Sequence, residues 1–339
     1  MLLRILKVEE AVGKVLAYDV SLVTESFKGA LLRRGHVLTH SDIDALKKAG
    51  HNYVYVYDSS SEDLVSDLHE EEAVLKLGEY LAGSNVSVSL GEEGKAVLKS
   101  MVDGLLKIKS SCLEKINSTG VFVVVTRRKG VAITKNSTVG IVDLIPLTVP
   151  KDYLDQLLND LKICRSAIEV SPFHRLRVGV VITGTEVFEG LIEDKASPVV
   201  EDKVSKYGGL VAGVIKVPDD SERIKEAISK FLKEFDAVIV TGGMSVDPTD
   251  LTPRSIAEVA DEVVMYGIPI KPNTMSMVAY AQEKPIIGVS SSIIYFKTWN
   301  ILDVLLPWVM AKEKITKEYL LSLGEGGLTE EFLKGRGWR

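Results

Sequence analysis

The sequence of 339 residues is poor in cysteine and has no long apolar run. Its two cysteines, Cys112 and Cys164, form neither a CxxC motif nor a Cys/His ligand pattern, so neither a disulfide framework nor a metal site of that kind is indicated. No uncharged apolar stretch approaches the roughly 18 residues that a membrane helix needs. The stretch 1–14 is amphipathic and interrupted by charges, unlike a signal peptide. We therefore expect a soluble protein in the reducing cytoplasm.

An excess of positive charge is also absent, because 41 Lys and Arg residues stand against 47 Asp and Glu residues and give a net charge of −6. A basic field for nucleic acid or for an anionic membrane is therefore not expected. The five histidines are scattered without metal-ligand or Ser/His/Asp spacing, and no P-loop or dinucleotide fingerprint occurs. A small anionic ligand in a locally basic pocket remains compatible with this charge.

Hydrophobic residues make up 46% of the chain and charged residues 26%, which at this length is typical of a globular protein with two or three domains. We expect a small β-rich N-terminal segment over 1–58, an α+β middle domain over 59–170 and an α/β domain over 175–312. The charged, glycine-containing end 313–339 is expected to be a mobile or loosely docked tail.

The N-terminal half contains four stretches with a helical pattern, and strand-type residues lie between the last two. The first helix would begin at Ser41 or Asp42 and end at Gly50. The four predicted helices are 41–50, 73–83, most of 94–118, and 152–167.

The C-terminal region alternates between apolar runs and amphipathic stretches. The run at 177–183 is continuously apolar, as expected of a strand covered on both faces. This alternation predicts an α/β fold with a doubly wound, mostly parallel sheet in three α/β/α layers, preceded by smaller α+β segments. The predicted strands are 177–183, 210–217, 236–241, "EVVMYG" and "KPIIGV", and the predicted helices are 197–209, 219–235, 253–260 and 295–312.

Three loops with unusual residues follow the ends of predicted strands, at 183–186, 241–250 and 267–275. Doubly wound sheets bind their ligands beyond the carboxyl ends of the strands. If the strands are parallel, all three loops meet at that edge.

The middle loop, "TGGMSVDPTD", allows two interpretations. Gly242 and Gly243 permit close backbone approach, so that N–H groups of the loop and Ser245 could face an anion. Asp250, and with it Asp247, could hold Mg²⁺ between the protein and phosphate oxygens. Alternatively, the glycines only make the turn and the aspartates only cap it.

The two outer loops are as ambiguous when each is taken alone. Thr183 and Thr185 could simply close a strand, and Glu186 could lie at the surface. Lys271 lies between two prolines and suits a phosphate, although a solvated lysine is more common. Because all three loops are expected at one edge, their combination favours a functional site.

At these loops the sequence resembles the molybdopterin-binding domain of molybdopterin molybdenumtransferases and molybdopterin adenylyltransferases. The family's "TGDE" element resembles "ITGTEV" (182–187), its "GGxSxGxxD" loop resembles "GGMSVDPTD" (242–250), and its "KPG" loop resembles "IKPNTM" (270–275). The likeness covers 175–312 and is weaker elsewhere. These motifs are more specific for the fold and the ligand class than for catalysis.

The sequence departs from the family pattern at four places. Thr185 stands where the transferase usually has aspartate, Asp247 stands at a loop glycine, and Asn273 replaces the glycine after "KP". The usual "GLPGNP" loop reads "GVSSSI" at 288–293. Three functional residues of the pattern persist, namely Glu186, Asp250 and Lys271.

The resemblance implies a role in molybdenum cofactor synthesis, with Mg²⁺ as a cofactor. In that role molybdopterin is adenylated with ATP, or its adenylated form releases AMP as molybdate is inserted. By analogy, Asp250 would hold the metal or orient the substrate, with Asp247 as a second metal ligand. Glu186 would assist at the same site, and Lys271 would neutralise phosphate or molybdate charge. The implied ligand-binding residues are Thr183, Gly184, Thr185, Gly242, Gly243, Ser245, Asn273, Ser290 and Ser291.

Two other functions stay open. A non-catalytic molybdopterin-binding carrier, sensor or regulator is favoured by Thr185 and by the altered loop at 288–293. A nucleotide-processing relative, such as a pyrophosphatase of the competence-damage type, is the third function. The resemblance also implies a homo-oligomer, a homodimer in preference to a trimer.

Overall fold

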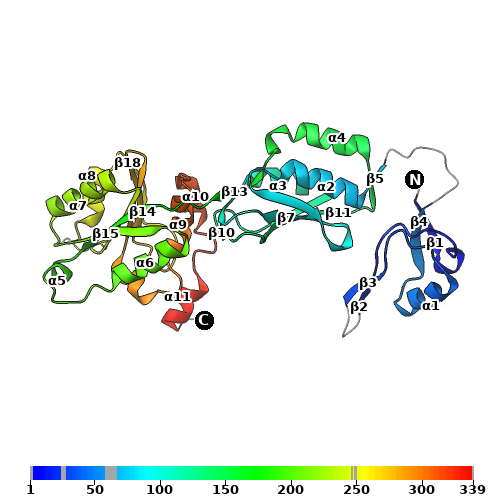
Figure 1. Ribbon diagram of the computed structural model, residues 1–339, viewed down its shortest axis with the longest axis horizontal. Coiled ribbons are helices and arrows are strands. Elements are labelled where there is room, and N and C mark those ends of the chain that lie inside the picture. Colours follow the sequence, from blue (N-terminus) through cyan, green and yellow to red (C-terminus); the bar gives the residue numbers. More distant parts are fainter. Residues whose placement is uncertain (1–2, 24–27, 58–66, 246, 248–249, 338–339) are drawn as a thin grey trace. The chain divides into compact units, whose positions relative to one another are not determined.

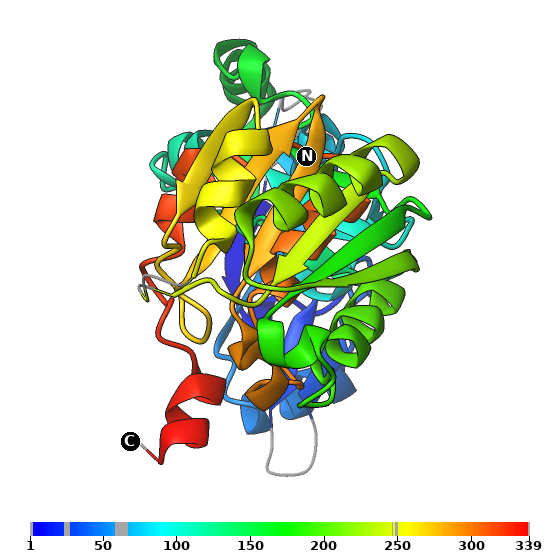
Figure 2. The same ribbon diagram turned by 90° about the vertical axis from the view of Figure 1, so that its left-hand side faces the viewer.

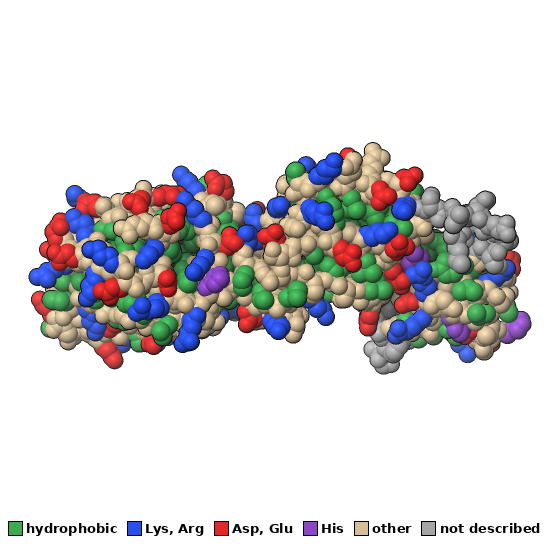
Figure 3. Space-filling model, turned by 45° about the horizontal axis from the view of Figure 1, so that its top comes forward, with side chains coloured by type: hydrophobic (Ala, Val, Ile, Leu, Met, Phe, Trp, Pro, Cys, Tyr) green, Lys and Arg blue, Asp and Glu red, His purple; other side chains and the backbone are tan. Residues whose placement is uncertain are grey.

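The computed structural model describes residues 3–23, 28–57, 67–245, 247 and 250–337. The chain forms two compact units, which are drawn in Figure 1. On the face drawn in Figure 3, the acidic and basic side chains of the described residues are interspersed. None of the helices in the described part combines the length and the apolarity needed to cross a bilayer. The first unit comprises 1–101, 107–128 and 135–170, and the second comprises 102–106, 129–134 and 171–339.

The first unit begins with short antiparallel strand pairs and one helix. The helix α1 (His40–Lys48) starts before the predicted Ser41, because Thr39 precedes it and donates its N–H to Asp42 Oδ2 at 2.8 Å. The strands are β1 (Leu3–Lys7), paired with β4 (Tyr53–Tyr57), and β2 (Val20–Val23), paired with β3 (Lys28–Leu32).

The rest of the first unit is an antiparallel sheet covered by helix α2 (Glu70–Leu81). The prediction of a mostly helical stretch at 94–118 is wrong, since only α3 (Ser110–Asn117) is helical there. "AVLKS" buries Ala96, Leu98 and Ser100 in alternation, which is the period of a strand. The sheet contains β6 (Val86–Leu90), β7 (Ala96–Ser100), β11 (Thr138–Leu144) and β9 (Phe122–Thr126), and the further elements of this unit are β5 (Asp67–His69), β12 (Thr148–Pro150) and α4 (Lys151–Asp160). Strand β10 (Ala132–Ile133) belongs to the second unit, and β8 (Gly104–Ile108) and β13 (Ile168–Pro172) have residues in both units.

The two cysteines are joined, which corrects the expectation of no disulfide. Cys112 lies in α3 and Cys164 lies in the short helix Lys162–Cys164, and both are buried. They are 52 residues apart in the sequence, so spacing alone carried no signal of the pairing. Cysteine usage therefore no longer argues for a reducing compartment.

Glu70 opens α2 and is half-buried, and this burial has a consequence for stability. Burial, reinforced by the neighbouring carboxylate of Glu71, raises the pKa of Glu70 from 4.5 to about 7. The folded protein therefore holds a proton on Glu70 that the unfolded chain releases above pH 4.5. The stability that this proton contributes is present at low pH and is lost as the pH rises through about 7.

We expect Glu70→Gln to raise the melting temperature at pH 8 and to leave it nearly unchanged at pH 4.5, because the amide stays neutral throughout. Circular dichroism melting at both pH values measures the effect. Glu79→Gln, on the exposed side of the same helix, is the control and should show no such pH dependence. A Glu70→Gln protein with the same shift at both pH values would contradict the assignment.

The second unit is built on a six-stranded sheet of the predicted α/β class. Four neighbouring strands are parallel, whereas β18 runs antiparallel to both of its neighbours. Strand β18 was not among the predicted strands, and its apolar "SMVAYA" directly follows the loop 267–275, here called the proline-containing loop. The order is β15 (Leu210–Val217), β14 (Arg177–Thr183), β16 (Ala237–Thr241), β19 (Lys284–Val289), β18 (Ser276–Ala281) and β17 (Glu262–Tyr266).

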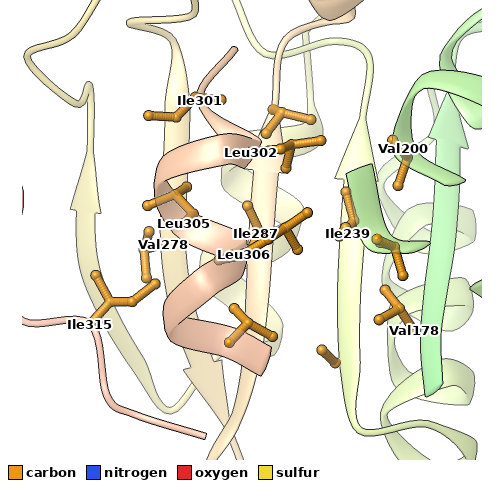
Figure 4. Packing of buried hydrophobic residues seen from close by; sticks show 14 of the residues in the cluster. Val178, Val200, Ile239, Val278, Ile287, Ile301, Leu302, Leu305, Leu306 and Ile315 are labelled. Carbon is orange, nitrogen blue, oxygen red and sulfur yellow. The ribbon is translucent and has the colours of Figure 1, made fainter. Parts of the chain in front are cut away.

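Helices cover both faces of this sheet and confirm the three-layer arrangement. Figure 2 shows α7 (Ser221–Glu234) and α8 (Thr252–Val259) on the face turned toward the viewer. The opposite face is covered by α6 (Ala196–Lys206) and α9 (Leu302–Met310). In Figure 4, Leu302 and Leu306 of α9 lie over Ile287 of β19.

The last predicted helix and the predicted tail both differ from expectation. The helix begins at Leu302 rather than at residue 295, and the Asn300 side chain accepts the Leu302 N–H at 2.9 Å. Beyond it, α10 (Lys317–Ser322) and α11 (Glu330–Arg336) follow. Leu320 is fully buried in the sheet core, so the described part of the tail is docked.

A buried ion pair joins α6 to α9. Lys203 and Asp303 have side chains only 2% and 5% exposed, and Lys203 Nζ lies 2.6 Å from Asp303 Oδ2. Burial alone would raise the pKa of Asp303, but hydrogen bonds from Lys203 and Lys206 outweigh it and lower that pKa. Tyr207 donates its hydroxyl to Asp303 Oδ1 at 3.1 Å. The buried charges of Lys203 and Asp303 therefore compensate each other, whereas the Lys206 side chain is half-exposed to solvent.

We predict that Asp303→Asn lowers the free energy of unfolding by about 3–5 kcal/mol, because it leaves the Lys203 ammonium buried without a counter-ion. Urea unfolding measures the loss. Asp202→Asn, an exposed change on α6, is the matched control and should cost less than about 0.5 kcal/mol. A loss below about 1 kcal/mol for Asp303→Asn would rule out the pair as a major stabilising contact.

Candidate functional site

The strand register brings the predicted loops together. Ile182 of β14 pairs with Thr241 of β16, Thr241 pairs with Val289 of β19, and Val289 pairs with Ser276 of β18. The next residues along the chain from β14, β16 and β19 therefore start their loops side by side. Since β17 also ends at this edge and β18 begins there, the 267–275 loop joins them.

Gly242 and Gly243 are required by close packing against the end of β14. Gly242 has φ +109°, and a Cβ there would lie 2.1 Å from the Thr183 carbonyl oxygen. Gly243 has φ +55°, and its Cβ would lie 2.9 Å from Thr252 Oγ1. Thr183 and Thr252 hold this corner together, since their hydroxyl oxygens are 3.0 Å apart. No larger residue fits the turn, as its glycine pair predicted.

Asp250 closes the middle loop on itself. Its Oδ2 accepts the Ser245 N–H at 2.6 Å, and its own N–H donates to the Asp247 carbonyl at 2.9 Å. Ser245 and Asp247 are exposed. Among the described residues, no group of three His, Cys, Asp or Glu side chains could hold a metal ion. A cation here would need oxygens from a ligand or from water.

The loop after β14 bonds to a carboxylate that the sequence analysis missed. Asp219 Oδ2 accepts the Thr185 N–H at 3.0 Å and the Thr185 hydroxyl at 3.3 Å. Asp219 Oδ1 would lie 3.5 Å from a Cβ on Gly243. Asp219 follows β15 at its carboxyl end, so its place after a strand was an available signal.

Two predicted residues of the same loop differ in their surroundings. Gly184 has φ +140° and donates its N–H to the Val217 carbonyl at 3.1 Å. Glu186 lies in the short helix α5 (Thr185–Phe188), and it is exposed. Gly184 therefore joins the packed corner, whereas the Glu186 side chain faces solvent.

The proline-containing loop is tied to the loop after β19. Asn273 Nδ2 donates to Ser292 Oγ at 2.8 Å and to Ser290 Oγ at 3.3 Å. Ser291, which was predicted to contact the ligand, is exposed, and Ser292 takes the position beside Asn273. Lys271 is exposed at the other end of this loop.

Two buried polar atoms at this edge have no hydrogen-bond partner within the described structure. They are Thr241 Oγ1 and Asn273 Oδ1, on residues only 1% and 6% exposed. Leaving a buried polar atom without a partner costs about 1–3 kcal/mol. A polar ligand that reaches the loops after β16 and β17 would offset this cost, so the two atoms favour binding at this edge.

Residues 179–310 match the family model described as a "Probable molybdopterin binding domain". These residues belong to the molybdopterin-binding domain family. The matched stretch contains every site residue discussed above. Separately, residues 5–58 match a model described as a domain of unknown function.

Known relatives match part of this chain over part of their own length. A CinA-like protein of Citrifermentans bemidjiense is 38% identical over 85 residues, which is 25% of this chain and 20% of that protein. A molybdopterin molybdenumtransferase of Staphylococcus epidermidis is 30% identical over 123 residues, which is 34% of this chain and 29% of that protein. The chain thus matches less than a third of either relative. The solved molybdopterin biosynthesis Mog protein of Mycobacterium ulcerans is 21% identical, with a TM-score of 0.34 over 40% of this chain and 95% of that chain.

Within the molybdopterin-binding domain, Tyr266 connects the middle loop to β17. Its hydroxyl donates to the Met244 carbonyl at 2.9 Å. Burial, together with the nearby negative charge of Asp250, raises the pKa of Tyr266. The middle loop therefore reaches from the end of β16 to Tyr266 at the end of β17, and Asp250 lies near the Tyr266 hydroxyl.

We predict that Gly242→Ala destabilises the molybdopterin-binding domain more than Gly190→Ala does. Both glycines have positive φ, but a Cβ at Gly190 meets nothing within 4 Å. Gly190→Ala should cost about 1–2 kcal/mol of unfolding free energy from backbone strain alone. Gly242→Ala adds the collision with Thr183, and urea unfolding of both variants measures the difference. Equal losses would show that the close approach to Thr183 is not required.

Proposed function

We propose that the molybdopterin-binding domain binds molybdopterin or adenylated molybdopterin at the carboxyl edge of its sheet and acts as a molybdenumtransferase-like enzyme. In this reaction adenylated molybdopterin releases AMP as molybdate is inserted. The proposal rests on one juxtaposition. The tight Gly242–Gly243 turn, the Asp219 and Asp250 carboxylates and the partly unsatisfied Asn273 amide follow strands that end at one edge of the sheet.

The protein's own groups would contribute mainly binding and orientation. Backbone N–H groups beside Gly242 and Gly243 provide donors for phosphate oxygens. Lys271 adds a positive charge, and Asn273 Oδ1 and Thr241 Oγ1 are available for polar groups of the ligand. Phosphoryl-type transfer depends on positioning and charge stabilisation more than on covalent work by the protein. These residue types suit that demand.

Mg²⁺ fits this site only as an ion shared with the substrate. Such ions are commonly held by one or two carboxylates together with phosphate oxygens and water. Asp250 would provide the principal protein oxygen and Asp247 a second one. Bound there, the ion would neutralise charge on the phosphate group. Asp250 would then change its contact with the Ser245 N–H or share it.

A non-catalytic molybdopterin carrier or sensor is the second candidate. It is favoured by Thr185, which occupies the position where the transferase pattern usually has aspartate. Thr185 also donates two hydrogen bonds to Asp219 and so occupies an acceptor oxygen of that carboxylate. This candidate differs from the first in turnover and not in binding. The homodimer implied by resemblance stays a prediction for both.

The charge of Asp250 can be separated from its hydrogen bond. Asp250→Asn keeps an oxygen that can accept the Ser245 N–H, whereas Asp250→Ala removes it. If the charge is required, both variants lose Mg²⁺-dependent affinity for molybdopterin and AMP release from the adenylated form, by about tenfold or more. Titration calorimetry and a molybdate-dependent AMP assay measure the two effects. Asp261→Asn, which retains an acceptor oxygen for the Gln282 N–H, is the control.

The outcomes distinguish the proposals. Binding with AMP release supports the transferase, and binding without release by the wild type supports the carrier or sensor. Unchanged binding and turnover in Asp250→Asn would reduce Asp250 to a loop-closing residue. If the wild-type protein binds neither molybdopterin nor its adenylated form, the proposed function is wrong.

A further inference from the structure

Two hydrogen bonds join the C-terminal segment 323–337 to the backbone of Lys271. The Lys271 N–H donates to the Gly327 carbonyl at 2.7 Å, and the Thr329 hydroxyl donates to the Lys271 carbonyl at 2.6 Å. Gly327 lies so close that a Cβ there would be 2.4 Å from the Pro269 carbonyl oxygen. The proline-containing loop and this segment therefore form one packed element.

Phe332 of α11 then lies beneath two cations. Its ring is buried, with 8% exposure, and packs against Phe296 with the ring centroids 6.0 Å apart. Lys271 Nζ lies 5.8 Å from the Phe332 centroid, and Arg336 Cζ lies 5.7 Å from it. Both distances are within the range of a cation–π interaction.

Among the described residues, these two cations have no carboxylate partner. Across the part of the chain that the structure describes, neither Lys271 nor Arg336 forms an ion pair, although both are exposed. An aromatic ring orients a cation without neutralising it, so both charges remain available to an anion. Lys271 is also two residues from Asn273, whose buried Oδ1 lacks a partner. Through Lys271, the pair of cations thus adjoins the carboxyl edge of the sheet, at which the unsatisfied atoms lie.

We propose that segment 323–337 completes the ligand site, with Phe332 orienting Lys271 and Arg336 to bind a phosphate or phosphoanhydride group. Arg336 contacts the anion, and Phe332 and Thr329 are positioning residues. This inference deepens the proposed function, because the adenylated form of molybdopterin contains a phosphoanhydride. The segment lies beyond the region matched by the family model, which ends at residue 310.

Variants of α11 test the inference in the full-length protein with inorganic pyrophosphate as the probe. Arg336→Gln removes one cation, and Phe332→Leu keeps apolar volume while removing the ring. Each should weaken pyrophosphate binding about three- to tenfold in titration calorimetry. Phe332→Tyr retains the ring and should restore wild-type affinity. Lys334→Gln removes an equal charge from the same exposed turn and should leave affinity unchanged.

Each outcome supports or overturns the subsite. Wild-type affinity in Arg336→Gln and Phe332→Leu would overturn it, as would an equal loss in Lys334→Gln or no pyrophosphate binding by the wild type. Failure of Phe332→Tyr to restore affinity would overturn the role of the ring. A melting curve for each variant separates loss of binding from loss of folding, and Arg336→Gln changes an exposed side chain.

Titration of the same variants with molybdopterin and its adenylated form separates this inference from the proposed function. If both bind but the adenylated form gains no affinity from Arg336, the subsite is wrong and the function stands. If neither binds while pyrophosphate binding depends on Arg336, the subsite stands and the function is wrong.

Discussion

Close backbone approach at the ends of β14 and β16 governs the carboxyl edge of the sheet. A side chain at Gly242 would collide with the Thr183 carbonyl, so the chain can leave β16 in this direction only with glycine there. That exit directs the following loop across the sheet, where Met244 meets the hydroxyl of Tyr266. The position of Asp250, which closes this loop, follows from the turn. The site is thus built on a steric constraint of the backbone.

The core beneath this edge keeps the constraint in place. Apolar side chains of both faces bury the sheet between α6 and α9 on one side and α7 and α8 on the other. The buried Lys203–Asp303 pair adds a directional contact to an otherwise apolar layer. Apolar packing tolerates sliding of one helix over another more readily than a fully satisfied ion pair does. The pair therefore helps to define how α6 and α9 sit over the strands.

Hydrophobic periodicity predicted most of the six-stranded sheet but failed for β18 and for the stretch 94–118. The continuous run at 177–183 and the amphipathic stretch at 219–235 correctly indicated a covered strand and a surface helix. By contrast, β18 was missed because "SMVAYA" directly follows a loop rich in turn residues. The stretch 94–118 was assigned to helix because its two strands are short and interrupted by lysines. Pairing with distant strands decided those segments.

The site residues at the carboxyl edge of the sheet could be predicted from the sequence only in part, for a similar reason. Gly242 and Gly243 predict a turn by their residue type alone. Asp219 and Ser292 form hydrogen bonds to Thr185 and Asn273, which are 34 and 19 residues away in the sequence. Residue spacing does not predict contacts of this kind. Asn273 looked like the loss of a glycine, yet it adopts φ +72° and bonds two serines. Asparagine tolerates that conformation better than most residues do.

The discontinuous second unit bears on how this domain could be moved between proteins. Its compact body includes 102–106 and 129–134, which precede the rest of the unit in the sequence. Gly130 has φ +80°, and a Cβ there would lie 2.6 Å from the ring of Tyr319 near the opposite end of the unit's sequence. A fragment starting at residue 171 would lose this neighbour and uncover the Tyr319 ring. Recombination at residue 171 would therefore transfer the second unit without the neighbour that covers Tyr319. The part of the chain that can be exchanged intact includes segments 102–106 and 129–134 as well as 171–339.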